Sequence, residues 1–279
     1  MTIPSARPAR PQTTLRVISR EQLSPHLVRL VLGGDQFDSF VDNGHTDKYV
    51  KIFFAKPGLG LRPPYDIEAL RETLAPEDLP VTRTYTVRAA DQDARTLTID
   101  FVVHGDEGLA GPWARDAEPG DEITFRGPGG AFSPRPEFDW YLFAGDLSAL
   151  PAIAAALEAL PADATGLAFV TVSSEDDILP LEAPEGVTVN WLVRSPDEDD
   201  GTDPTLDLAD AIAAEPWPEG RPQVFAHGER TAMKALRNLF KERGITRDQL
   251  SLSGYWALGR TEDRFQAEKR EPIGVIEPV

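Results

Sequence analysis

The first half of the chain is a series of short runs rich in β-branched and aromatic residues, separated by Gly, Pro and Asp. In one run the apolar side chains of Leu97, Ile99 and Phe101 alternate with Thr98 and Asp100. This alternation is typical of a strand with one buried face. Six such runs predict an antiparallel β-barrel. They are Thr14–Ser19, Leu27–Leu32, Tyr49–Phe54, Thr84–Ala89, Thr96–Val103 and Glu122–Arg126.

Two Pro-rich stretches interrupt this pattern. Pro57–Pro80 reads as an insertion with a helix at Ile67–Thr73, and Phe132–Glu137 reads as a linker. The linker divides the chain into two expected domains, residues 13–134 and residues 138–279.

After the linker, strands alternate with helices, which predicts a parallel sheet with helices on its faces. The expected strands are Trp140–Ala144, Leu167–Val172, Val187–Val193, Gln223–Ala226 and Leu250–Tyr255. The expected helices are Leu150–Leu160, Leu206–Ala214 and Thr231–Arg243. The acidic run Pro196–Pro204 is predicted to be a solvated loop.

Composition narrows the chemistry. The 279 residues include no cysteine and four histidines with no metal-ligand spacing, which excludes disulfides, iron–sulfur clusters and cysteinyl zinc sites. We therefore expect no metal ligands, and any redox chemistry must come from a bound organic cofactor. The net charge of −18 argues against nucleic acid and anionic membranes as partners.

No apolar run approaches the ~20 residues that cross a bilayer. The first twelve residues lack the apolar segment of a secretory signal and are interpreted as a loose tail. We expect a cytoplasmic protein, without membrane insertion, that acts as a monomer.

A first motif, Arg83-Thr84-Tyr85-Thr86, lies on a predicted strand, where Arg83 and Tyr85 share one face and the two threonines share the other. A flavin site needs such parts: a guanidinium for phosphate, an aromatic ring beside the isoalloxazine, and a hydroxyl for the polar edge. An exposed strand with the same residues is the alternative.

A second motif runs from His104 through Gly108, Leu109, Ala110 and Gly111. It follows a strand and opens a short helix, where small residues let backbone N–H groups approach a phosphate. An ordinary Gly-rich turn would look the same.

A third motif, Gly145-Asp146-Leu147-Ser148, turns the first strand of the second domain into its first helix, where such folds bind dinucleotides. It lacks the Gly-x-Gly-x-x-Gly fingerprint, which disfavours a standard Rossmann site, and it could be a plain connection.

Taken in order, these motifs resemble the ferredoxin–NADP reductase architecture and, more closely, the siderophore-interacting protein family of ferric-siderophore reductases. The stretches Tyr49–Lys51, Gly127–Gly130, Trp191–Arg194, His227–Glu229 and Ser253–Glu262 extend the likeness from about Thr14 to Lys269. The Gly-Tyr-Trp-x-x-Gly-Arg-x-Glu pattern that begins at Gly254 is its most specific part.

The resemblance implies a reductase that passes a hydride from NADH or NADPH to FAD and then single electrons to a ferric siderophore, which releases Fe(II). It implies flavin contacts at Arg83, Tyr85, Thr86, His104, the turn Gly108–Gly111 and Trp113. Gly145, Asp146, Ser148, Gly228 and Glu229 would border the nicotinamide cleft, with Trp256 near the flavin as a gate. No acid–base catalytic residue is required.

Two departures concern the siderophore. Members of the family often carry basic residues where this chain has Gly129, Ala257 and Leu258. Lys51 remains, and Arg126, Arg260 or Lys48 are the expected substitutes.

The acidic run Glu175–Asp177, after the second strand of the nicotinamide domain, favours NADH over NADPH, with Arg194 as the counter-argument. A flavin reductase that serves a protein partner, and a non-enzymatic siderophore or flavin carrier, are the competing interpretations.

Overall fold

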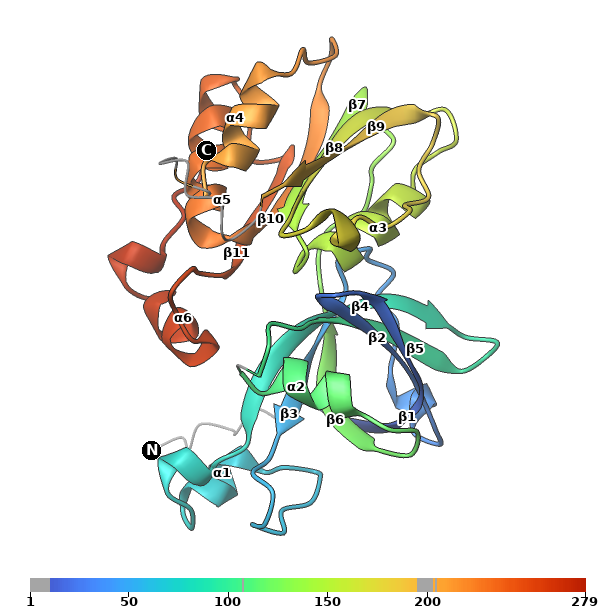
Figure 1. Cartoon of the computed structure of the whole chain (residues 1–279), viewed down its shortest axis with the longest axis vertical. Helices are drawn as coiled ribbons and strands as arrows, with labels where there is room; N and C mark the ends of the chain where they lie inside the picture. The colour runs from blue at the N-terminus through green and yellow to red at the C-terminus, as the bar shows by residue number, and fades with distance from the viewer. Residues whose placement is uncertain (1–10, 107, 195–202, 204) are drawn as a thin grey trace, which may run out of the picture.

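The computed structural model describes residues 11–106, 108–194, 203 and 205–279. The molecule has two parts stacked along its long axis, a barrel and an α/β layer structure (Figure 1). The predicted N-terminal tail up to residue 10, and nearly all of the acidic run Pro196–Pro204, lie outside the described residues.

The first part is a closed barrel of six antiparallel strands in the order β1-β2-β5-β4-β3-β6, as predicted. The strands are β1 (Thr13–Ser24), β2 (Leu27–Gly33), β3 (Tyr49–Phe54), β4 (Val81–Asp91), β5 (Thr96–Val102) and β6 (Glu122–Gly129). Alternate side chains, among them Leu30, Ile99 and Phe125, fill the interior and are fully buried. Complete closure leaves no free edge strand.

Four barrel strands are longer than predicted, β2 by one residue and β1, β4 and β6 by more, because their partners extend the pairing. β1 continues through polar residues to Ser24, which pairs with Leu27 of β2. β4 begins at Val81, opposite Phe54 of β3, and β6 runs on to Gly129, opposite Tyr49. The hydrogen-bonded ladder, rather than local hydrophobicity, sets these ends.

The helices of the first part are short. The insertion carries α1 (Ile67–Arg71), two residues shorter than predicted, and α2 (Ala110–Asp116) follows β5. Single 3-10 turns occur at Phe37–Ser39 and Pro76–Asp78 in this part, and at Glu175–Asp177 and Pro272–Gly274 in the second part.

The second part is a parallel five-stranded sheet in the order β11-β10-β7-β8-β9, again as predicted. Its strands are β7 (Trp140–Asp146), β8 (Thr165–Val172), β9 (Gly186–Val193), β10 (Pro222–Glu229) and β11 (Leu250–Trp256). The helices α3 (Leu150–Glu158), α4 (Asp207–Ala214) and α5 (Arg230–Glu242) pack against it. Central β7 is buried from Trp140 to Gly145 because both of its faces are covered.

A further helix, α6 (Glu262–Glu268), was not predicted. It extends from the second part toward the barrel (Figure 1). The buried carboxylate of Glu268 holds it in place by pairing with Arg230, Arg260 and Arg264. These three guanidinium groups lower the pKa of Glu268 to about 2.

Several contacts join the domains, among them an aromatic cluster around Phe132 and the buried carboxylate of Asp177. Phe132, in the expected linker, is buried among Phe143 and Phe225 of the second domain, so the linker is a packed element. Asp177 is fully buried and accepts hydrogen bonds from Ser24 Oγ at 2.7 Å and from the backbone N–H of His26 at 3.2 Å. Within the described residues, no helix is long and apolar enough to span a bilayer.

Candidate functional site

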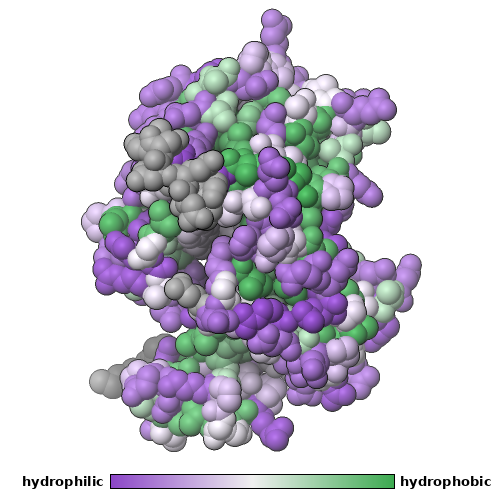
Figure 2. All heavy atoms as spheres, viewed as in Figure 1, coloured by the Kyte–Doolittle hydropathy of each residue, from purple (hydrophilic) through white to green (hydrophobic). Residues whose placement is uncertain are grey.

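The main cavity, of about 1050 Å³, opens between the barrel and the α/β domain. Figure 2 shows the surface indented between the two parts, on the left of the view. One wall comes from β3, β4 and α2, the other from the carboxyl ends of the parallel strands, and α6 closes one side. In α/β sheets the carboxyl ends of the strands are the usual place for a ligand.

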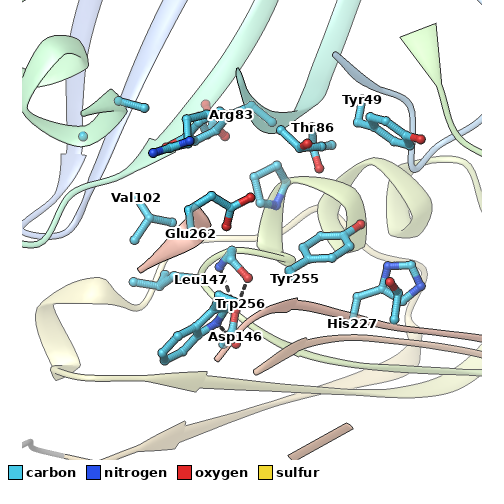
Figure 3. A pocket seen from close by; sticks show the side chains of 18 of the residues that line it. Tyr49, Arg83, Thr86, Val102, Asp146, Leu147, His227, Tyr255, Trp256 and Glu262 are labelled. Carbon is cyan, nitrogen blue, oxygen red and sulfur yellow. Dashed lines mark hydrogen bonds between the residues drawn. The ribbon is translucent and has the colours of Figure 1, made fainter. Parts of the chain in front are cut away.

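Strand β4 supplies the barrel wall with Arg83, Tyr85 and Thr86. The Tyr85 ring packs on Phe101 with its centroid 4.4 Å away. Burial raises the pKa of the Tyr85 hydroxyl above its ordinary value. In Figure 3, Thr86 faces Tyr255 of the opposite domain, and Arg83 lies beside Glu262.

The turn after β5 completes the barrel wall. His104, Gly108, Leu109, Ala110 and Gly111 all line the cavity. Trp113 does not, because its ring packs into the barrel core, where it meets Phe54 and Phe101 at 5.8 and 6.0 Å between centroids.

Asp146 organises the opposite wall. It accepts hydrogen bonds from the backbone N–H and hydroxyl of Ser148 at 2.8 and 2.5 Å. It also accepts from the Glu229 N–H at 2.9 Å and from the Trp256 indole N–H at 2.8 Å. The last bond, drawn in Figure 3, holds the Trp256 ring across the cavity wall.

Three of the residues expected at this cleft support its wall without facing the cavity. Gly145, Gly228 and Glu229 do not line the cavity. Gly228 has φ +152°, and a Cβ there would lie 2.6 Å from Asp146 Oδ2, so only glycine fits. The Glu229 carboxylate caps α5 by accepting from the N–H groups of Thr231 and Ala232.

His227 lines the cavity floor, although in the family-like stretch His227–Glu229 only Gly228 and Glu229 were expected at the cleft. Its ring stacks on Phe225 at 3.9 Å between centroids and contacts Tyr255 edge-on at 4.9 Å. Nε2 lies 2.9 Å from Ser251 Oγ, while buried Nδ1 has no partner among the described residues. Burial lowers the pKa of His227 to about 3, so the ring is neutral at pH 7.

A polar cluster lies at the ends of β8 and β9. Thr171, Ser173 and Arg194 line the cavity with Asp207 of α4. Both carboxylate oxygens of Asp207 accept from Arg194 Nη1, at 2.9 and 2.8 Å. Of the acidic run expected here, Asp177 points into the domain contact and does not line the cavity.

Of the residues expected to bind the siderophore, only one lines the cavity. Lys51 lines the cavity. Arg126 lies over the Phe53 ring at 5.5 Å, and Arg260 donates to Glu268 at 2.9 Å, so neither reaches it. Lys48 pairs with Asp42 at 2.9 Å. The structure brings Lys269 of α6 to the cavity instead.

The same fold is found in the FAD/NAD-binding domain of a nitric oxide dioxygenase from Vibrio cholerae, which superposes with a TM-score of 0.62 at 17% identity, over 88% of this chain and 98% of that one. Residues 16–132 match the family model of the siderophore-interacting FAD-binding domain, and residues 138–259 match that of the siderophore-interacting protein. The chain belongs to the siderophore-interacting protein family, and its barrel is an FAD-binding domain of that family.

Relatives of similar length support the assignment. An uncharacterized protein of Mycobacterium tuberculosis is 43% identical, over 94% of this chain and 96% of its own. The ferric vibriobactin reductase ViuB of Vibrio cholerae is 34% identical, over 91% and 93%. An NADPH-dependent ferric-chelate reductase of Escherichia coli is 30% identical, over 87% and 91%. Among solved structures, the siderophore-interacting protein SipS of Aeromonas hydrophila superposes with a TM-score of 0.80 at 29% identity, over 96% and 100%.

Proposed function

We propose that this protein is an FAD-dependent ferric-siderophore reductase that takes its electrons from NADH or NADPH. The observation that carries the proposal is the single cavity shared by the FAD-binding barrel and the carboxyl ends of the parallel sheet. The names of two relatives, a ferric vibriobactin reductase and a ferric-chelate reductase, support it.

The barrel wall fits FAD. Arg83 supplies a guanidinium for the pyrophosphate, and the turn Gly108–Gly111 supplies small residues that let backbone approach it. Tyr85 offers an aromatic face beside the Thr86 hydroxyl. Across the cavity, on β10, Nδ1 of His227 is a buried polar atom with no partner among the described residues, which a bound ligand would satisfy. When bound, FAD supplies the ability to accept two electrons together and release them singly.

The opposite wall would receive the nicotinamide nucleotide. Asp146 and Ser148 lie at the turn after β7, and the Trp256 ring stands over them, fixed by its bond to Asp146. These residues would orient the nicotinamide and exclude water from it. We place the domain division at residues 13–134 and 138–279, supported by the end of β6 at Gly129 and the start of β7 at Trp140.

Lys51 would hold the siderophore, whose ferric complexes are commonly anionic, by charge attraction. The proposed reaction transfers electrons and requires no general acid or base from the protein. Weaker binding of Fe(II) than of Fe(III) then releases the iron.

The test begins with the visible spectrum of the purified protein, which we expect to be yellow with non-covalent FAD. NADH, NADPH and a ferric siderophore are then added in turn under anaerobic conditions. We expect the nucleotide to bleach the flavin and the chelate to restore its colour. A colourless protein that takes up no FAD would overturn the proposal. Bleaching without reoxidation by any ferric chelate would favour a reductase for a protein partner, and a flavin that no nucleotide bleaches would favour a carrier.

A further inference from the structure

Two lysines from distant parts of the chain meet at the cavity. Lys51 lies on β3, and Lys269 follows directly after α6; both line the cavity. Their ammonium groups are close enough for the charge of Lys51, together with burial, to lower the pKa of Lys269. Two positive charges repel each other, which costs free energy. A bound anion would offset this repulsion.

These lysines differ from their neighbours in forming no close ion pair. The neighbouring cations Arg83, Arg260 and Lys48 are each paired with a carboxylate. Within the described part of the chain, neither Lys51 nor Lys269 forms an ion pair, although the charge of Glu262 acts on Lys269. In a protein with a net charge of −18, two ammonium groups in one cavity make a local site for negative charge.

The fold holds Lys269 in this place. Its neighbour Glu268 is anchored by three arginines, and the Lys269 ammonium lies 4.6 Å above the ring of buried Phe265. A Cβ on Gly129 would lie 2.4 Å from the Tyr49 ring, so a larger residue there would require that ring to move. In this chain a basic group reaches the cavity from Lys269, after α6.

Strand β4 separates Lys51 from one part of the expected phosphate site. In the barrel order β5-β4-β3, the turn Gly108–Gly111 follows β5, Arg83 lies on β4, and Lys51 lies on β3. One opposing carboxylate, Glu262, also lines the cavity and interacts with Lys269.

We propose that Lys269, together with Lys51, forms the anion-binding end of the cavity and makes this protein select highly anionic ferric chelates over neutral ones. This inference rests on the proposed function and deepens it by naming the class of substrate and a residue that determines it.

The test compares the parent with Lys269→Gln and Lys269→Arg, using trianionic Fe(III) tris-catecholate and neutral Fe(III) tris-maltolate at low ionic strength. We expect Lys269→Gln to raise the apparent KM for the trianionic chelate about tenfold, which is about 1.4 kcal/mol, and to change that for the neutral chelate by less than about twofold. Lys269→Arg should stay near the parent, and Glu262→Gln should lower the KM for the trianionic chelate.

Binding is measured separately by calorimetry with Ga(III) tris-catecholate, which has the same charge and is not reduced. Lys241→Gln is the matched control, because it removes one positive charge from exposed α5, away from the cavity. Equal KM and Kd values in the parent and Lys269→Gln would overturn the inference. So would weaker FAD binding by Lys269→Gln with unchanged chelate binding, because Lys269 would then serve the flavin. Failure of the parent to reduce either chelate would count against the proposed function itself.

Discussion

The guanidinium of Arg83 on β4 forms a two-point ion pair with the carboxylate of Asp263 on α6, with Nη1–Oδ1 at 2.8 Å and Nη2–Oδ2 at 3.2 Å. The pair joins the barrel to a helix 180 residues further along the chain. The group we expect to bind the flavin pyrophosphate is therefore also the group that contacts α6, and a phosphate and Asp263 would share its donors.

We expect Arg83→Ala to weaken FAD binding. Loss of a charge-assisted phosphate contact costs ~1.5–3 kcal/mol, or about ten- to hundredfold in affinity. Fluorescence titration of the apoprotein with FAD measures the change. Asp263→Asn is the companion variant: it frees the same guanidinium, so its FAD affinity should equal or exceed that of the parent. If Arg83→Ala retains FAD as tightly as the parent, another residue holds the phosphate.

Lys51→Ala should raise the apparent KM for the ferric chelate several-fold and leave flavin reduction by the nicotinamide nucleotide unchanged, because Lys51 lies on the barrel wall away from the Asp146 turn. Stopped-flow measurement separates the two half-reactions. Lys56→Ala removes a lysine that pairs with Asp78 outside the cavity and serves as the control. Equal damage to both half-reactions would assign Lys51 a structural role.

We expect a preference for NADH over NADPH, but the acidic run Glu175–Asp177 is no longer the reason for it. The segment after β8 offers Ser173 to the cavity rather than the carboxylates of Glu175–Asp177, and Asp207 pairs with Arg194 there. A paired guanidinium attracts a 2′-phosphate weakly. The ratio of kcat/KM values at one ionic strength measures the preference, and Asp207→Asn should shift it toward NADPH several-fold. A tenfold preference of the parent for NADPH would contradict this prediction and make Arg194 the phosphate anchor.

Glu268→Gln should destabilise the docked α6. The carboxyl pKa is lowered from 4.5 to about 2 in the folded protein. Its ionisation therefore stabilises the fold above about pH 4.5, and this contribution is lost as the pH falls toward 2. The melting temperature of the variant should lie several degrees below that of the parent at pH 7, because three arginines lose their common partner. The gap should narrow in acid, and a gap independent of pH would show that ionisation of Glu268 is not its cause.

Much of the architecture follows from local pattern. The alternation at Leu97–Phe101 predicts a barrel strand with one buried face, and the apolar run at Trp140–Ala144 predicts a central parallel strand, because the side chains on each face of a strand reflect whether that face meets core or solvent. The motifs around Arg83, Gly108 and Asp146 all lie on the walls of the cavity.

Tertiary structure decided which side chains reach the cavity. Arg126 and Arg260 are as basic in sequence as Lys51, yet the Phe53 ring and the Glu268 carboxylate hold them elsewhere. Lys269 belongs to none of the sequence motifs, and it reaches the cavity because α6 extends toward the barrel. Charge and residue type are local properties, whereas the partner that a charged side chain meets depends on contacts between segments far apart in the chain, and those contacts exist only once both domains have packed.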